Sequence, residues 1–181
     1  MAGGKKGCLV IFIIVGVSIL LLCPSVQKTR GRLNALHEEV TATWSHIDET
    51  FQRRVDLIPN LVETVKLYAP HEEEVFGTLT RLQLKVATRM PLPAKIAANN
   101  DLTAALNQLL MMAERYPDLK ADPTFILLQG KLADTENRIA EGRMRYNEAV
   151  REYNSYSQKF PTVFVAAVFG FNKIPILDAP E

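Results

Sequence analysis

The chain has 181 residues, of which 48% are hydrophobic and 23% charged, and its formal net charge is +1. Its 21 Lys and Arg residues balance 20 Asp and Glu residues, which argues against nucleic-acid binding, because a nucleic-acid binder normally carries a concentrated basic face. Both cysteines, Cys8 and Cys23, lie in an apolar segment at the start of the chain. The roughly 150 residues that follow are the size of a single domain.

The N-terminal segment has no charged residue between Gly7 and Gln27. As a helix it would be about 30 Å long, the thickness of a bilayer's hydrocarbon core. We therefore expect residues 1–27 to be a retained membrane anchor, with residues 28–181 as one helical domain. A cleaved signal peptide has a shorter apolar region, usually about 7–15 residues, and the bulky Leu22 before Cys23 disfavours a lipoprotein signal. Basic residues flank the segment on both sides, so the side of the membrane that carries the domain stays open.

A long apolar stripe follows the anchor. Its steps of three and four residues predict a helix, and the 3-4-4 rhythm is an 11-residue repeat that favours a nearly straight one. Pro59 is expected to kink or break this helix near Leu57–Ile58. Trp44 and Phe51 are expected to face the bundle interior. The stripe consists of Leu33, Leu36, Val40, Trp44, Ile47, Phe51, Val55, Ile58, Val62 and Val65.

Prolines and polar residues divide the middle of the chain. Pro70 is expected to begin a second helix with Glu72–Glu74 in its first turn. Met90–Pro93 should form a turn, and Asn99–Asp101 should cap a third helix. Residues 116–121 should form a loop.

A second long helix is expected from Asp122 as N-cap and Pro123 as first residue to about Ser157. Its charged side chains, Glu136 and Arg143 among them, should lie on solvated faces. Pro161 can begin a short last helix that Gly170 ends. With no strand-like alternation in the sequence, the fold is expected to be all-α: an N-terminal transmembrane helix, then a long antiparallel bundle of about four main helices with a short C-terminal one.

Motifs for catalysis or metal binding are missing from the sequence. None of His37, His46 and His71 is preceded three residues earlier by Glu, as a di-metal bundle site requires. There is also no phosphate-binding loop, no Gly-x-Ser-x-Gly and no Cys-x-x-Cys. We therefore expect no catalytic residue, no cofactor and no metal.

Two polar patterns remain. In the first, Asp56 and Asn60 flank Pro59 and are expected to bond the backbone groups that the proline leaves unpaired. In the second, Tyr146 and Tyr153 are seven residues apart and share a helix face, as do Asn147 and Asn154. Packing of the tyrosines in the core, with hydroxyl partners on adjacent helices, is the favoured interpretation, and a ligand-binding face is the alternative.

The C-terminal segment is apolar from Phe160 to Leu177, with Lys173 its only charge. Phe164, Val168 and Phe171 are spaced by four and three residues, so they share one side of a short helix. Such a surface is a candidate for self-association or membrane contact. The alternative is that it closes the core of its own bundle.

Five blocks of motif residues follow one another along this sequence. Their residues are Arg53, Arg54, Asp56, Pro59, Asn60, Glu63, Tyr116, Pro117, Glu136, Asn137, Arg138, Tyr146, Asn147, Tyr153, Asn154 and Phe169–Phe171. In this order the blocks resemble the LemA family of bacterial membrane-anchored helical proteins, and the match weakens between Met90 and Ala98. The resemblance implies an N-terminal membrane helix, a mostly antiparallel helical bundle and no established enzymatic activity, and some relatives are linked to organelle-membrane formation.

The function expected from these features is that of a non-enzymatic scaffold, anchored by a single pass in a bacterial cell membrane, that self-associates and organises or remodels the membrane. Its expected partners are membrane lipid and further copies of itself; any protein partner is unknown, and nucleic acid is not expected. The alternative is a membrane-tethered sensor or adaptor that binds a peptide or partner protein through its helical surface. A hydrolase would need a polar cluster inside a pocket.

Overall fold

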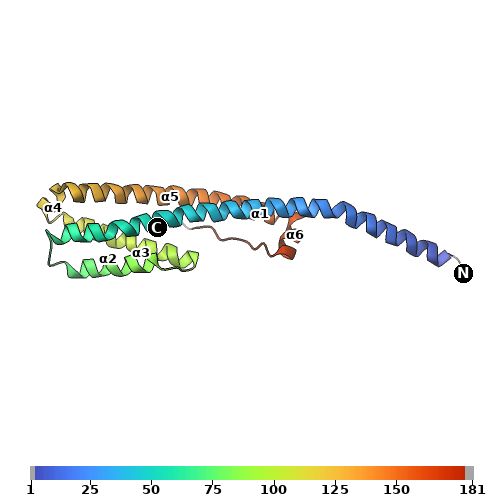
Figure 1. Cartoon of the computed structure of the whole chain (residues 1–181), viewed down its shortest axis with the longest axis horizontal. Coiled ribbons are helices and arrows are strands. Elements are labelled where there is room, and N and C mark those ends of the chain that lie inside the picture. Colours follow the sequence, from blue (N-terminus) through green and yellow to red (C-terminus); the bar gives the residue numbers. More distant parts are fainter. Residues whose placement is uncertain (1–2, 178–181) are drawn as a thin grey trace. The chain divides into compact units, whose positions relative to one another are not determined.

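The computed structural model describes the backbone of residues 3–177 and the side chains of residues 25–177. All regular secondary structure in that range is helical, which confirms the all-α prediction (Figure 1). The helices are α1 (Gly3–Lys66), α2 (Glu73–Ala87), α3 (Leu92–Ala113), α4 (Pro117–Ala121), α5 (Pro123–Ser157) and α6 (Thr162–Phe169).

The chain forms two compact units. The first contains the chain up to Ala42 together with Tyr146–Leu177, and the second contains Thr43–Arg145. Helices α1 and α5 each have residues in both units. Helix α6 belongs to the first unit, and α2, α3 and α4 belong to the second.

The expected anchor, residues 1–27, lies almost wholly outside the residues whose side chains are described. Its backbone is helical from Gly3 onward. Among the residues that the structure does describe, no helix combines the length and the apolar character needed to cross a membrane.

The apolar stripe of α1 is confirmed as the core-forming face of this helix. Leu33, Leu36 and Val40 are buried in the first unit, and Ile47, Phe51 and the later members in the second. Trp44 is the exception, because it is only half-buried. Its ring meets that of Phe51 edge-on, with 6.1 Å between the ring centroids.

The break expected at Pro59 is absent, since α1 continues through it to Lys66. Pro59 lies on the exposed side of the helix, away from the core. Ile58 and Leu61, on the opposite side, are fully buried and hold the helix against the core. Tertiary packing therefore outweighs the proline's cost.

The middle helices begin elsewhere than expected. Helix α2 starts at Glu73 rather than at Pro70, with Glu73 and Glu74 in its first turn. Helix α3 starts at Leu92, because Pro93 fits the first turn, where no backbone N–H is needed. Asn99 is consequently a buried residue inside α3 and not a cap. The segment expected as a loop contains the short helix α4.

The start of α5 is confirmed in atomic detail. The backbone N–H of Phe125 donates to Asp122 Oδ1 at 2.9 Å, as an N-cap requires, and Pro123 is the first helical residue. Within the second unit α5 approaches α1 closely at Gly142. A β-carbon at this position would lie 2.8 Å from Ile47 Cγ1.

The two ends of the short C-terminal helix α6 lie where the sequence predicts them. Helix α6 begins after Pro161 and ends at Gly170, whose φ of 77° is the left-handed conformation that glycine adopts readily. The backbone N–H of Phe171 closes the turn by donating to the carbonyl of Ala166 at 2.9 Å. Residues 172–177 then continue without regular secondary structure; we call them the tail.

Candidate functional site

A buried polar cluster in the second unit contains the motif residues Arg54 and Glu136. Arg54 is 3% exposed and pairs with Glu136 at 2.7 Å. The same guanidinium nitrogen donates to Thr103 Oγ1 at 2.9 Å. Burial lowers the pKa of Arg54, while the Glu136 carboxylate acts in the opposite direction. The pair joins α1 to α5, and the threonine adds α3, so one arginine connects three helices.

Two further buried cations complete the connections. Arg143, on α5, donates to Asn100 Oδ1 on α3 at 2.7 Å, and its pKa is lowered by burial, against the opposing effect of Glu136. Lys95, on α3, is 6% exposed and forms an ion pair with Asp48 on α1. Each contact joins a different pair of helices, so the cluster specifies which faces of α1, α3 and α5 meet.

The structure corrects one expectation. Arg143 was expected on a solvated face but is only 7% exposed. Glu136 was expected there too, and its side chain is 45% exposed while it pairs with the buried Arg54. Sequence reasoning also missed Lys95. The available signal was helical spacing, because Lys95 lies three and seven residues before the buried Ala98 and Leu102.

The other motif residues that α1 and α5 contribute to the second unit lie at the surface. Arg53 pairs with Glu49 one turn earlier at 2.6 Å, and Arg138 pairs with Asp134 at 2.7 Å. Asp56, Asn60, Glu63 and Asn137 are exposed, like Pro59. In the described part of the chain, neither Asp56 nor Asn60 makes the expected side-chain hydrogen bond to the backbone around Pro59.

Hydrogen bonds from two tyrosine hydroxyls stabilise the turns at the ends of the second unit's helices. Tyr116, just before the first residue of α4, Pro117, donates to Glu72 Oε1 at 3.1 Å, and Tyr68 donates to Asp122 Oδ2 at 2.9 Å. Burial raises the pKa of Tyr116, and the bond to Asp122 raises that of Tyr68. The hydrogen bond from the N–H of Phe125 contributes most to lowering the pKa of Asp122. These contacts are structural.

In the first unit, the predicted Asn147/Asn154 face binds a segment of the protein's own backbone. Asn154 Nδ2 donates to the carbonyl of Ile174 at 2.7 Å, and its Oδ1 accepts the N–H of Ile174 at 3.0 Å. Asn147 makes the same two contacts with Leu177, both at 2.8 Å. We call the two asparagines the amide clip. Each amide uses both its donor and its acceptor on one residue of the tail.

The tyrosines of the same face take different positions. Tyr153 is fully buried, donates to the carbonyl of Asn172 in the tail at 3.0 Å, and packs edge-on against His37 with 5.8 Å between ring centroids. Tyr146 is 1% exposed, and burial raises the pKa of both tyrosines. The partner of the Tyr153 hydroxyl is thus the tail, where an adjacent helix was expected.

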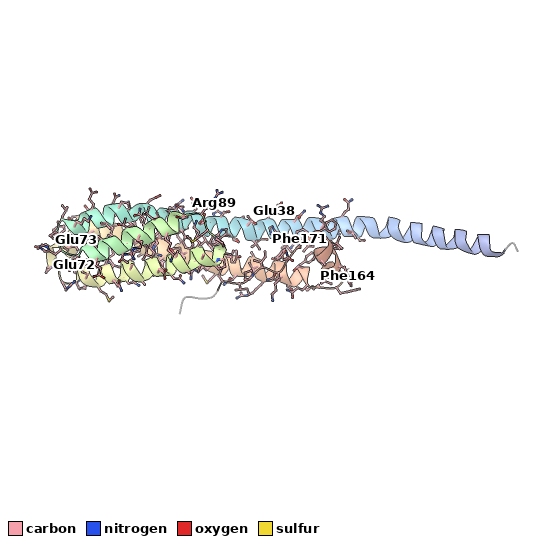
Figure 2. The ribbon with its side chains drawn as sticks, turned by 90° about the horizontal axis from the view of Figure 1, so that it is seen from below. Glu38, Glu72, Glu73, Arg89, Phe164 and Phe171 are labelled. Carbon is pink, nitrogen blue, oxygen red and sulfur yellow. The ribbon has the colours of Figure 1, made fainter. Side chains whose placement is uncertain are left out.

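Helix α6, which carries the candidate interaction surface, has a buried side and an exposed side. Thr162 and Ala166 are buried, whereas Phe164 and Val168 are 63% and 79% exposed. Phe171, past the end of the helix, is half-buried. Figure 2 marks Phe164 and Phe171. With Phe160 and Val163, which are also exposed, Phe164 and Val168 form an apolar patch that we call the α6 surface.

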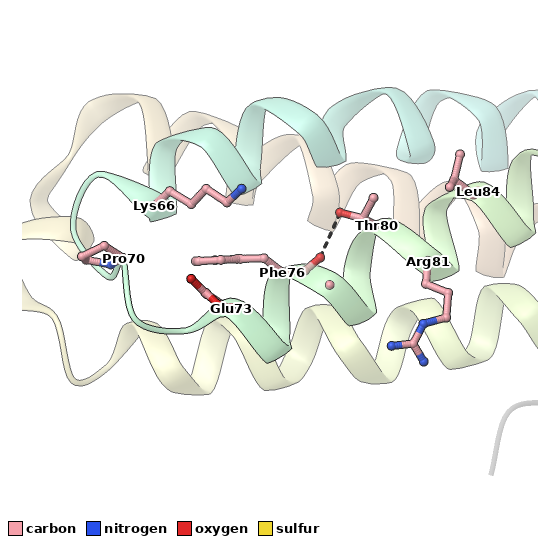
Figure 3. A pocket seen from close by; sticks show the side chains of 8 residues that line it. Lys66, Pro70, Glu73, Phe76, Thr80, Arg81 and Leu84 are labelled. Atoms are coloured by element: carbon pink, nitrogen blue, oxygen red, sulfur yellow. Dashed lines mark hydrogen bonds between the residues drawn. The ribbon is translucent and has the colours of Figure 1, made fainter.

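The second unit also has an open pocket of about 740 Å³ between the end of α1 and α2 (Figure 3). Lys66 Nζ lies 5.5 Å from the centroid of the Phe76 ring, and Glu73 and Arg81 add charges to the lining. The lining contains no histidine, cysteine or serine. No group of three or more potential metal ligands occurs among the described residues.

Comparison with known proteins gives a consistent result. The LemA family model matches residues 43–181. A protein named Magnetosome protein MamQ, from Magnetospirillum gryphiswaldense, is 24% identical over 90% of this chain and 70% of its own length. Magnetosome protein MamQ 2 of Paramagnetospirillum magneticum is also 24% identical, over 87% of this chain and 68% of its own. Protein LemA of Metamycoplasma hominis is 21% identical over 99% of this chain and 81% of its own.

Proposed function

Because this chain belongs to the LemA family, we propose that it is a non-enzymatic scaffold that self-associates at a bacterial membrane and organises or remodels that membrane. Residues 1–27 are the proposed single-pass anchor, since their charge-free stretch is long enough for the hydrocarbon core. The names of the MamQ relatives, which are magnetosome proteins, are compatible with this role.

The observation that carries the proposal is the α6 surface. Its side chains are exposed although the helix has a buried side formed by Thr162 and Ala166. Phe160 and Phe164 stack edge-on with 5.9 Å between ring centroids, so the patch presents ordered aromatic area. Contiguous exposed apolar patches usually mark contacts with protein or membrane.

The test uses the full-length protein extracted from membranes in mild detergent. Phe164→Asp with Val168→Asp should reduce the size of the assembly measured by light scattering, because two carboxylates cannot be buried in an apolar contact. Ile126→Asp with Met144→Asp is the matched control, since both side chains are exposed on α5. A particle of one protomer in the wild type would contradict self-association, and release of the wild type by carbonate washing would contradict the anchor.

A second candidate function is that of a membrane-tethered sensor or adaptor that binds a peptide. The observation in its favour is the amide clip, whose four hydrogen bonds hold an extended segment. An adaptor of this kind should be a single protomer that binds a peptide from another protein at the clip, whereas the scaffold should form higher assemblies.

A further inference from the structure

We propose that the amide clip is an exchangeable binding site for an extended peptide backbone, and that its occupant between molecules is the tail of a second copy of this chain. The proposal rests on the self-association proposed above and adds the element that would mediate it. Within one molecule the clip binds the protein's own tail, so the structure already shows that the tail sequence fits the clip.

The amide clip recognises polypeptide backbone. The side-chain amides of Asn147 and Asn154 form hydrogen bonds with the N–H and carbonyl groups of Leu177 and Ile174. A side-chain amide that pairs with both backbone groups of one residue satisfies them as a neighbouring β-strand would. Recognition therefore depends on an extended backbone, independent of which molecule supplies it.

The spacing of the two asparagines on α5 matches the spacing of the two tail residues that they bind. The two asparagines are seven residues apart on α5, a rise of about 10.5 Å. Ile174 and Leu177 are three residues apart, which spans about 10 Å in an extended chain. Pro175 lies between them, where no N–H is needed by the clip. The spacings match only if the tail is extended, and it then runs antiparallel to α5.

The side chains of the two clipped residues are less exposed than those of the other tail residues. Leu177 is 8% exposed and Ile174 half-buried, whereas Asn172, Lys173, Pro175 and Ile176 are exposed. The occupant therefore supplies one apolar side chain at each clipped residue. The tail is joined to α5 through α6, which ends at the left-handed Gly170. Because all protomers have the same sequence, the tail of another protomer can form the same contacts with the clip.

The balance between the two arrangements depends on concentration. A tail attached to its own unit acts at an effective concentration on the order of millimolar. Copies crowded on a membrane patch can compete with that value, whereas dilute copies cannot. Exchange would thus be favoured where the protein is concentrated.

The experiment mixes two full-length variants with different N-terminal affinity tags. One, Asn147→Ala with Asn154→Ala, has lost the clip but keeps the tail. The other, Ile174→Asp with Leu177→Asp, keeps the clip but has lost the apolar contacts of the tail. Together they supply one working clip and one working tail, so the mixed complex should co-purify about tenfold above either variant mixed with itself, because loss of about 1.4 kcal/mol of contact energy is tenfold in affinity.

Matched controls use neighbouring exposed residues. Asn137→Ala removes an exposed asparagine of α5, and Asn172→Asp with Ile176→Asp adds two carboxylates to exposed tail positions. The mixture of these two control variants should behave as the wild type does. No enrichment of the clip–tail mixture over the self-mixtures would overturn tail exchange.

A second measurement needs no variant and so does not depend on mutant folding. A synthetic peptide of residues 172–177 should reduce exchange of protomers between two differently tagged wild-type samples, and N-methylation at Ile174 and Leu177 should abolish this effect by removing the two N–H donors. Equal effects of both peptides would contradict the clip as the site. If wild-type protomers associate and neither peptide changes their exchange, tail exchange is overturned and the scaffold proposal stands. If wild-type protomers never associate, the scaffold proposal itself is contradicted.

Discussion

The two units use opposite kinds of polar contact to hold their parts together. In the second unit, buried cations join specific side chains on three helices, as Arg54 does with Glu136 and Thr103. In the first, the neutral amides of Asn147 and Asn154 bind backbone. A buried charge without its partner is costly, so the ionic contacts tolerate only one arrangement. Amide-to-backbone bonds depend on chain conformation instead, and any suitable extended segment can supply them.

The largest effect is expected from the ionic side of this comparison. Arg54→Ala should lower the free energy of unfolding by about 3 kcal/mol, because it removes the buried cation that pairs with Glu136 and donates to Thr103. Urea unfolding followed by circular dichroism measures the change. Arg53→Ala is the matched control, since its side chain is 59% exposed, and it should change stability little. Equal losses in the two variants would show that burial of Arg54 does not matter.

A smaller effect is expected at the clip. Asn154→Ala should lower the free energy of opening of the tail by about 2 kcal/mol, since two hydrogen bonds are lost and the backbone groups of Ile174 can turn to water. Hydrogen–deuterium exchange of the tail amides measures this opening, which should leave the second unit unaffected. Asn137→Ala should leave the exchange unchanged. If Asn154→Ala accelerated exchange throughout both units, the clip would be part of the core.

Close packing of α1 on α5 gives a third test. Gly142→Ala should cost about 1 kcal/mol net, because the new methyl group must displace Ile47 and this outweighs the gain in helix propensity. Gly130→Ala, on the same helix, meets no atom within 4 Å and should be stabilising. Thermal unfolding of both variants decides the sign. A stabilising Gly142→Ala would mean that the second unit is held by its ion pairs with little need for close helix contact.

The smallest effect is expected from acid. The pKa of Asp122 is lowered from its usual 3.8, chiefly by the N–H of Phe125. Its contribution to stability is therefore present above the unfolded-state pKa and is lost as pH falls through the lower folded-state value. Asp122→Asn, which keeps a capping oxygen, should be less sensitive to acid than the wild type in unfolding series run down to about pH 2. Tail exchange, which depends on neutral amides, should not follow this titration. Identical acid sensitivity in both proteins would contradict a role for the charge of Asp122.

Sequence reasoning succeeded where local chemistry decides the structure. Asp122 followed by Pro123 located the start of α5, and Gly170 located the end of α6, because capping depends on a few adjacent residues. It failed where packing overrides local preference. Pro59 remains inside α1 because its neighbours are buried, and the asparagines expected to cap α3 lie within that helix.

The candidate sites were predicted in part for the same reason. Spacing placed Asn147 and Asn154 on one face, but their partner is 20 to 30 residues later, and no local pattern reports such a return of the chain. The ion pair of Arg54 with Glu136 likewise joins helices far apart in the sequence. Both residues belong to the motifs by which the sequence resembles the LemA family, yet the motifs alone give no geometry.

The antiparallel course of the tail along α5 has a mechanical consequence. A force on the tail directed along the axis of α5 would load the bonds at Asn147 and Asn154 together, in shear. A pull perpendicular to the helix would instead load Leu177 first and then Ile174, one pair at a time. The same four hydrogen bonds would therefore resist sliding more strongly than peeling.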